Sequence, residues 1–300
     1  MQDDLEFHAL REDPSLWERL IEEENTRAET EPAARERVES MYWERDRAKA
    51  FQRYFESLDF QQVTELLGIF GLTHEQTLCE IGGGSGQLAW SLAKAGFKHV
   101  DLLEPNALPV TGTGWLQTQV ASGATAVGIC NSLDDWYADK ARYDVIVTRN
   151  CVHHFPNIAL VAAAIRQKIQ PGGRWIMIRE AFADTPQELR AALQTHPYCQ
   201  KYGVYEFYFP ARHYVESLEF AGFKLRAVVP SGYGNNAISG YTSDGGKPST
   251  QRRTKTWRMM LKRMPVVTTG LFRAETFLKR NLGLRRNRYS RPQIMVFERV

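Results

Sequence analysis

A glycine-rich stretch with an acid just before it, TLCEIGGGSGQLAW at residues 77–90, holds the residues best placed to bind a cofactor. Glycines between an apolar run and a helical pattern bring a ligand close to backbone N–H groups at a helix N-terminus. The letters GSGQLA also fit the G-x-G-x-x-G/A pattern of dinucleotide-binding turns, and Glu104 follows Gly84 by 20 residues. The Glu80 carboxylate opposes that interpretation, because an acid at this place would repel a pyrophosphate. It favours S-adenosylmethionine (SAM), whose methionine end carries an ammonium beside a sulfonium.

Two adjacent histidines, His153 and His154 in the segment CVHHF, are the residues best suited to remove a proton. They follow the apolar run YDVIVT, which we predict to be a strand. Open α/β sheets bind ligands beyond the carboxyl ends of their strands. A hydroxyl that attacks the sulfonium must lose its proton to a base, whereas a neutral amine or a thioether needs none. Because imidazole accepts a proton near neutral pH, we predict His154 as the general base and His153 as a second catalytic candidate. The alternative, which we favour for His153, is a hydrogen-bonded anchor of the loop.

Strands and helices must alternate to position these residues. Short apolar runs rich in β-branched residues are separated by helical patterns, which indicates an α/β fold with a parallel sheet covered on both faces. We expect strands at 77–81, 99–103, 124–130, 143–148, 174–180, 224–230 and 292–300. Helices are predicted at 157–169 and 209–223, and PGG at 171–173 ends the first of them. Pro109, Gly112 and Gly114 delay another helix to the region of Trp115.

Residues 1–60 are expected to form a helical N-terminal lid, ahead of one domain at 61–300. Phe51, Tyr54, Phe55 and Leu58 make one apolar stripe on a charged rod, and Val63, Leu66, Leu67 and Phe70 make a second that Gly71 ends. From this lid, side chains could reach the cofactor carboxylate or the substrate; the candidates are Tyr42, Trp43, Arg45 and Arg47.

Four segments in this order resemble the motifs of the class I SAM-dependent methyltransferases. CEIGGGSGQ is similar to their first motif, an acid, an apolar residue and then G-x-G-x-G, here Gly82, Gly84 and Gly86. LLEPN resembles the end of their second strand, YDVIVTRNCVHHF the fourth strand and its loop, and IRQKIQPGGRWIMIRE the helix, turn and fifth strand. The resemblance is firm over 60–184 and looser to 300. It implies a SAM-dependent methyltransferase with a doubly wound, mostly parallel seven-stranded sheet and an antiparallel last strand.

The resemblance also implies roles for residues that follow the strands. Glu104, with Pro105 beside it, would accept hydrogen bonds from both ribose hydroxyls of SAM. Asn131 or Ser132 after the third strand would contact the adenine, unless Asn131 only caps a turn. Asn150 follows the fourth strand, where the family offers backbone carbonyls to the cofactor ammonium.

The methyl acceptor is the least determined part of the prediction. Two insertions, at 181–208 and 231–291, interrupt the motifs, and the stretch 196–223 loosely resembles methyltransferases of bacterial saccharide and natural-product pathways. Its tyrosines suit a hydroxylated acceptor, unless they cover the core; they stand at 198, 202, 205, 208 and 214. We predict O-methylation of a small acceptor. The alternatives are N- or S-methylation of a small molecule, or a non-catalytic SAM-binding or RNA-associated protein.

Charge is distributed unevenly along the chain. Residues 1–60 hold 17 Asp and Glu against 9 Lys and Arg, whereas 251–300 hold 14 Lys and Arg against 2 Glu. The basic stretch 251–291 could contact an anionic substrate or a membrane surface. It could equally be a solvated face or dock on the acidic N-terminus. We do not expect nucleic acid as a partner, because no recognised RNA-binding motif accompanies the arginines.

Composition sets the expected compartment and excludes some chemistry. The start, MQDDLEFHAL, is acidic where a secretory signal would be basic, and no apolar run approaches the ~20 residues of a membrane span, so we expect a cytoplasmic protein. The four cysteines form no CxxC pair, which favours reduced thiols and no metal site.

Overall fold

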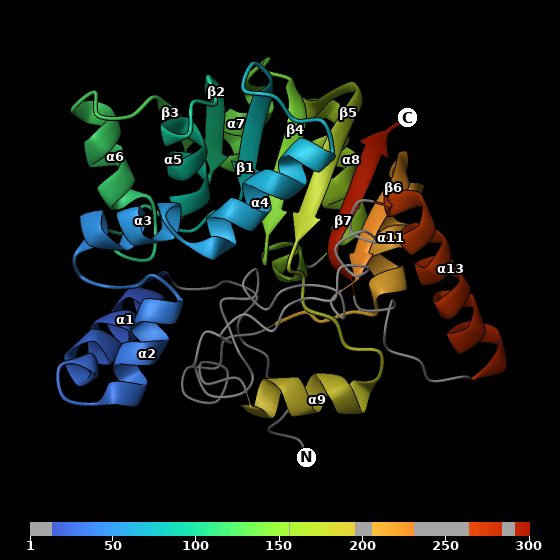
Figure 1. Ribbon diagram of the computed structural model, residues 1–300, viewed down its shortest axis with the longest axis horizontal. Coiled ribbons are helices and arrows are strands. Elements are labelled where there is room, and N and C mark those ends of the chain that lie inside the picture. The colour runs from blue at the N-terminus through green and yellow to red at the C-terminus, as the bar shows by residue number, and fades with distance from the viewer. Residues whose placement is uncertain (1–13, 156, 196–205, 231–263, 284–291) are drawn as a thin grey trace.

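The computed structural model describes residues 14–155, 157–195, 206–230, 264–283 and 292–300. Its centre is a seven-stranded sheet in the order β3-β2-β1-β4-β5-β7-β6 (Figure 1). The first five strands pair in parallel, and β7 pairs antiparallel with both β5 and β6. The predicted fold class is therefore confirmed. The strands are β1 (Thr77–Ile81), β2 (His99–Leu103), β3 (Val127–Cys130), β4 (Tyr143–Arg149), β5 (Ile169–Ile178), β6 (Phe223–Pro230) and β7 (Pro292–Arg299).

Helices cover both faces of the sheet, because successive side chains of each strand point to opposite sides. In β1, Leu78 belongs to one apolar core and Cys79 to the other. The first core contains residues of α3 (Arg47–Phe55), α4 (Leu58–Ile69), α5 (Gln87–Lys94) and α6 (Gly114–Ala121). The second contains residues of α7 (Leu133–Ala138), α8 (Ile158–Lys168), α11 (Ala211–Phe220) and α13 (Pro265–Leu282).

The carboxyl ends of the parallel strands all meet at one edge of the sheet, which is the lower edge in Figure 1. On that side lie the paired helices α1 (Pro14–Ala28) and α2 (Pro32–Ser40), and also α9 (Pro186–Thr195). The loops that follow β1, β2, β4 and β5 therefore face the N-terminal helices, and these loops carry most of the predicted site residues.

The N-terminal segment is helical, but the predicted continuous rod is wrong. The chain leaves α2 at Ser40 and begins α3 at Arg47, after Tyr42 has taken a left-handed φ of 56°. Asp46 and Ser57 cap α3 and α4 by accepting the N–H groups of Lys49 and Phe60, so each cap starts a new helix. Leu58 consequently begins α4 instead of extending the stripe on α3, and it is 53% exposed. Residue 60, the predicted end of the lid, lies inside α4.

The second apolar stripe is confirmed. Val63, Leu66, Leu67 and Phe70 are buried in the first core, and Gly71 takes a φ of 80° just after α4. The other expected elements also lie close to their observed places, including the late helix α6, which begins at Gly114.

Two strands differ from the prediction at their starts. The third strand begins at Val127 instead of 124, because the N–H of Ala124 still donates to Gln119 at the end of α6. β5 begins at Ile169, before the PGG turn, and an irregularity in its pairing with β4 accommodates the extra residues. The third strand ends at Cys130 as predicted, whereas β5 ends at Ile178, two residues before the predicted end at 180.

Helix α13 lies within the predicted insertion 231–291 and was not foreseen. It packs against β6: Thr268 Oγ1 donates to the carbonyl of Val228, and Thr269 Oγ1 accepts its N–H, at 2.5 and 3.0 Å. Proline near its start and Gly283 after its end are ordinary helix signals that the charge of the segment obscured. Among the described residues, no helix is long and apolar enough to cross a membrane.

Candidate functional site

The glycine loop after β1 makes a tight turn that depends on the backbone conformation of its glycines. Gly82, Gly84 and Gly86 have positive φ angles of 67°, 57° and 81°. A Cβ at Gly82 would lie 2.1 Å from Cys151 Sγ, and one at Gly86 would lie 2.6 Å from Leu116. The loop therefore requires glycine for its conformation and for its contact with the loop after β4, and it leads directly into the N-terminus of α5.

Glu80 lies beneath this loop instead of on its surface. The residue is 1% exposed, and its Oε2 accepts the N–H of Ala89 in the first turns of α5 at 2.9 Å. Burial raises its pKa to about 7, although the nearby charge of Arg149 acts in the opposite direction. The carboxylate thus fixes the loop to the helix. Because Glu80 lies beneath the loop, its electrostatic attraction for a cofactor ammonium would act across the loop backbone.

Glu104 stands at the end of β2, beside the glycine loop. Its Oε2 accepts the N–H of Gly84 and its Oε1 accepts the N–H of Asn106, each at 2.9 Å. Each carboxylate oxygen has a second lone pair. The ribose contact of Glu104 stays a prediction, and Pro105 beside it is exposed.

Asn131 and Ser132, the adenine candidates, have structural hydrogen bonds. The Asn131 amide donates to the Glu104 carbonyl at 2.6 Å and to Thr113 Oγ1 at 2.9 Å, and its Oδ1 accepts from Gln117 at 2.6 Å. Ser132 caps α7 by accepting the N–H of Asp135. Asn131 ties β3 to β2 and α6, so it is Ser132 that performs the capping role that we considered for Asn131.

Asn150, directly after β4, is exposed and takes a left-handed φ of 50°. Its N–H donates to the carbonyl of Ile178 at the end of β5, at 2.9 Å. This bond holds the start of the β4 loop against the neighbouring strand, so Asn150 opens the loop that carries the two histidines.

His153 is held between two glutamates. Its Nδ1 lies 2.9 Å from Glu180 Oε2, its Nε2 lies 2.8 Å from Glu206 Oε2, and the side chain is 1% exposed. Burial disfavours the charged ring, but the hydrogen bonds to both carboxylates outweigh it and raise the pKa of His153 to about 9. His153 is therefore a cation at neutral pH, and this geometry supports the anchor interpretation over a catalytic one.

Glu180 extends this clamp to the backbone. Its two oxygens accept the N–H groups of Cys151, Val152 and His153 at 3.1–3.2 Å. Burial alone would raise the pKa of Glu180, but its bonds to His153 and to these N–H groups lower it. The loop after β4 is thereby fixed to the residue that follows β5 by two positions.

His154 is placed differently from its neighbour. Its side chain is 30% exposed, and its Nε2 lies 3.7 Å from Glu206 Oε2. The two imidazole rings are 4.2 Å apart between centroids. His154 is thus a partly accessible imidazole beside a buried carboxylate.

A metal could in principle use the same group of side chains, because ligand-type atoms of His153, His154 and Glu206 lie within 4.8 Å of one another. Both nitrogens of His153 already face carboxylates, so we interpret the group as an imidazolium clamp. The expected absence of a metal stays a prediction.

Glu180 and Glu206 were missed from the sequence. Glu180 was assigned only to a strand, and Glu206 lies in the predicted insertion 181–208. The only local signal was their polarity next to apolar or aromatic residues, in MIRE and YEF. Their common partner, His153, is 27 and 53 residues away along the chain, so only the fold brings them together.

The side chains expected to reach out from the N-terminal lid mostly hold that segment together. Arg45 pairs with Glu22 and Glu29 on α1 and on the turn after it, and Trp43 packs against Trp17. Arg47 is buried and donates to the carbonyls of Tyr42 and Glu44. Tyr42 approaches the glycine loop, since its carbonyl also accepts from Gln87.

Tyrosines of the stretch 196–223 are divided between roles. Tyr214 is fully buried and donates to the carbonyl of Ala181, so it covers the core. Tyr208 lies with its ring 5.4 Å from that of His153, next to the clamp. Tyr198, Tyr202 and Tyr205, together with Cys199, lie outside the described residues.

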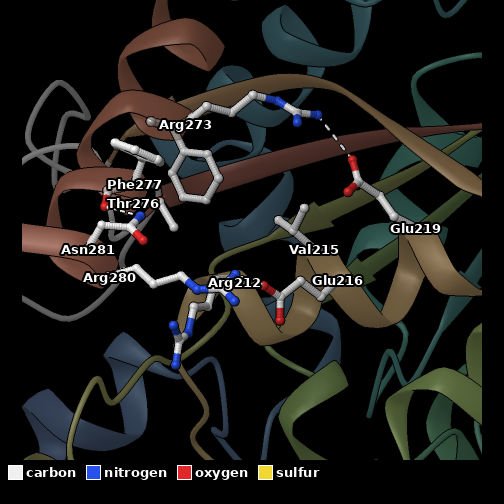
Figure 2. Close-up of a pocket in the computed structure, with 10 residues that line it drawn as sticks. Arg212, Val215, Glu216, Glu219, Arg273, Thr276, Phe277, Arg280 and Asn281 are labelled. Atoms are coloured by element: carbon white, nitrogen blue, oxygen red, sulfur yellow. Dashed lines mark hydrogen bonds and ion pairs between the residues drawn. The ribbon is translucent and has the colours of Figure 1, made fainter.

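A groove of about 410 Å³ lies elsewhere, between α11 and α13 (Figure 2). In the described part of the chain its walls come from these two helices, and Arg273 and Arg280 pair across it with Glu219 and Glu216. Lys279 of α13 pairs with Asp184. The basic side chains of α13 thus contact acids near α11 and α9; residues 251–263 and 284–291 of the basic stretch lie outside the described residues.

The chain matches a known protein family and resembles several solved structures. The family described as "Methyltransferase domain" matches residues 30–228. None of the curated proteins matches the chain. Similar solved structures include the magnesium protoporphyrin IX methyltransferase from Synechocystis PCC 6803, with 14% identity, 80% of this chain and 81% of that chain covered, and a TM-score of 0.45.

Two further structures have a similar degree of likeness. A geranyl diphosphate methyltransferase in complex with SAM has 13% identity, covers 80% of this chain and 85% of that chain, and has a TM-score of 0.47. The O-methyltransferase of a trans-AT PKS multienzyme from Brevibacillus brevis has 14% identity, covers 79% and 70% of the two chains, and has a TM-score of 0.44. At this level the likenesses say nothing about the acceptor of the present chain.

Proposed function

This chain belongs to the methyltransferase domain family, and from that premise we propose that it transfers a methyl group from SAM to a hydroxyl of a small acceptor. The family membership confirms the sequence-based assignment: the protein is an enzyme, a SAM-dependent methyltransferase of class I fold. The proposal concerns what the family does not specify, namely the atom that is methylated, the class of acceptor and the base.

The proposal for O-methylation rests on His154. In-line transfer requires a nucleophile positioned against the sulfonium with water excluded, and a hydroxyl must also lose its proton. His154 follows β4, at the same edge of the sheet as the glycine loop. Its side chain is partly exposed, and a carboxylate lies 3.7 Å from its Nε2. That carboxylate, from Glu206, would stabilise the imidazolium formed when the ring takes the proton.

His153 and Glu180 would then serve to hold His154 in place. Because the clamp fixes the backbone of residues 151–153, the next ring has little freedom to turn away. The clamped ring of His153 lies against that of His154, with 4.2 Å between the ring centroids.

For the acceptor we propose a saccharide-like or natural-product molecule with several hydroxyls. The tyrosine-rich stretch motivates this class, and Tyr208 beside His153 is its described representative near the base. Helices α1 and α2 lie on the same side of the sheet, so we propose that residues 1–60 act as a lid over this site. An anionic contact at 251–291 and the cytoplasmic location stay predictions.

The decisive test is incubation with methyl-labelled SAM and a fractionated metabolite extract, followed by mass spectrometry of the labelled product. We expect a product whose label resists mild acid and base, as a methyl ether does, and whose precursor carries free hydroxyls. A labelled amine or sulfonium product would instead assign N- or S-methylation. SAM bound without turnover on any fraction would contradict the enzymatic proposal for small acceptors.

A further inference from the structure

Two arginines end neighbouring strands and meet at one carboxylate. Arg149 is the last residue of β4, and Arg179 directly follows β5. Arg149 Nη2 lies 2.5 Å and Arg179 Nη1 3.6 Å from Oδ2 of Asp59, in the first turn of α4. The side chains of both arginines are 16–18% exposed, and that of Asp59 is 3% exposed. Two guanidinium groups are therefore held together at the carboxyl edge of the sheet.

The charges of these groups divide unequally. Burial would lower the pKa of Arg149, but Asp59, Tyr54 and Glu80 more than offset it and raise the pKa above its usual range. Burial and the like charge of Arg149 lower the pKa of Arg179 to about 10, because Asp59 compensates only in part. Asp59 thus offsets the burial of Arg149, and it offsets the burial of Arg179 only in part.

The surroundings of the pair are polar and aromatic. The guanidinium of Arg149 lies 4.9 Å from the centroid of the Tyr54 ring, and the fully buried hydroxyl of Tyr54 has no hydrogen-bond partner among the described residues. Tyr42 meets Tyr54 edge-on with 5.1 Å between centroids. A donor hydroxyl in a buried site without an acceptor is costly, and an anion nearby would relieve that cost.

Backbone strain is concentrated at the same place. The non-glycine residues with left-handed φ in the described part of the chain are Tyr42, Asn150 and Arg179, at 56°, 50° and 60°. Arg179 itself is one of them, Asn150 follows Arg149, and Tyr42 contacts Tyr54. Such conformations are energetically costly, and they cluster where a ligand must be positioned. An ion pair that served only to attach α4 to the sheet would require neither the second arginine nor the strain.

We propose that Arg179, held beside Arg149 by Asp59, binds a carboxylate group of a ligand at the carboxyl ends of β4 and β5. A guanidinium presents two N–H groups in a plane, and this fork matches the two oxygens of a carboxylate. Asp59 is a positioning residue: it orients the pair but does not touch the ligand. The inference rests on the proposed function for its location, because the methyl donor and the acceptor must meet beyond this edge.

Two ligands could supply the carboxylate. One is the α-carboxylate of the methionine end of SAM, since β4 lies next to β1 and its glycine loop. The other is an acid group on the acceptor, since β5 is one strand farther from that loop. The chemistry at Arg179 is the same in both cases, so binding experiments must distinguish the sources.

Isothermal titration calorimetry on the full chain tests the proposal without turnover. The first arm compares SAM with decarboxylated SAM, which keeps the sulfonium and the amine but lacks the carboxylate. If SAM is the source, the wild type prefers SAM by about tenfold to hundredfold. Arg179→Gln reduces that preference to within about threefold and leaves the affinity for decarboxylated SAM unchanged.

The second arm uses the protein saturated with S-adenosylhomocysteine and compares D-glucuronate with D-glucose. If the acceptor supplies the carboxylate, the wild type binds glucuronate more tightly than glucose, and Arg179→Gln abolishes the difference while the SAM preference persists. Arg179→Lys keeps the charge without the fork and should restore only part of either effect. Arg174→Gln, a change of another arginine five residues earlier on β5, is the matched control and should behave like the wild type.

The proposal is overturned if Arg179→Gln gives the wild-type ratio in both arms while its thermal unfolding shows a folded protein. Failure of the proposed function would look different. A protein that binds SAM through Arg179 but labels no hydroxyl compound would contradict O-methylation and leave this inference intact.

Discussion

The two halves of the proposed site, one for the cofactor and one for the acceptor, are built in opposite ways. The cofactor half, around the glycine loop, is local: Glu80, Gly84 and Glu104 lie within 25 residues, and their hydrogen bonds join β1 to α5 and the glycine loop to the end of β2. The acceptor half, around the histidines, joins residues that are far apart: Glu180 and Glu206 contact His153, and Asp59 contacts Arg149 across 90 positions. Local sequence therefore specifies the first half, whereas the second depends on the packing of α4, β5 and the segment before α11.

The electrostatics of the halves differ accordingly. In the cofactor half, carboxylates accept backbone N–H groups, so charge is used to shape a loop. In the acceptor half, buried ions of both signs face one another, and removal of one partner leaves the other buried and unpaired. We therefore expect substitutions in the acceptor half to disturb rate and stability, and substitutions in the cofactor half to disturb mainly SAM affinity.

The largest effect is expected for His154→Ala. Loss of a general base typically lowers a rate by about 10²–10⁴-fold, so kcat should fall in that range while SAM affinity stays nearly intact. Steady-state kinetics and calorimetry measure the two quantities. His213→Ala, which removes another exposed histidine on α11, is the control and should retain activity. Full activity of His154→Ala would mean that the proton leaves by another route, and loss of wild-type activity with EDTA would point to a metal at the histidines.

The next effect concerns the stability of the clamp. The folded-state pKa of His153, about 9, lies above that of a free imidazole, roughly 6.5. The clamp therefore contributes fully below about pH 6.5, and its contribution is lost as the pH rises through 9, by up to roughly 3 kcal/mol. Urea unfolding at pH 6 and pH 9.5 should show this loss in the wild type.

His153→Gln is the matched variant, since glutamine can still hydrogen-bond but cannot take the charge. Its free energy of unfolding should change less between the two pH values than that of the wild type. The pKa of Glu180 is lowered, so its contribution to stability is lost at low pH. Protonation of Glu180, below the usual titration range of a glutamate, should weaken the clamp again. Identical pH profiles for wild type and variant would mean that His153 is not a cation in the folded protein.

The smallest of the three effects is expected in the cofactor half. Glu104→Ala should weaken SAM binding by roughly 1.5–3 kcal/mol, because two ribose hydroxyls lose a charged acceptor. kcat at saturating SAM should change little, which is the contrast with His154→Ala. Glu75→Ala, which removes a surface acid paired with Lys98, should leave SAM affinity unchanged. Unchanged affinity in Glu104→Ala itself would remove this residue from the ribose site and confine it to bracing the loop.

Much of the molecule was determined by the sequence alone. Local conformational preferences are set by the apolar runs of the strands and by the glycines at 82, 84 and 86. The order of elements, the fold class and the enzyme family therefore followed from short contiguous patterns. The break between α3 and α4 was missed because the apolar stripe from Phe51 to Leu58 runs across Ser57, and only the capping bond of Ser57 shows that a new helix begins. α13 was missed because its end signals, a proline near the start and Gly283 after the end, lie in a stretch that we interpreted only from its basic residues.

Tertiary structure alone decided the ionic half of the site. No periodicity marks these four residues: Arg179 and Glu180 follow one another after an apolar strand, Glu206 stands between two aromatic residues, and Asp59 stands between Leu58 and Phe60. Their roles depend on distance and burial. A carboxylate within 3 Å of His153 Nδ1 makes this candidate base a buried cation. The neighbouring His154 keeps a partly exposed ring. Which of two adjacent histidines can accept a proton is thus a property of their surroundings, because the energy of a charge depends on what replaces its water.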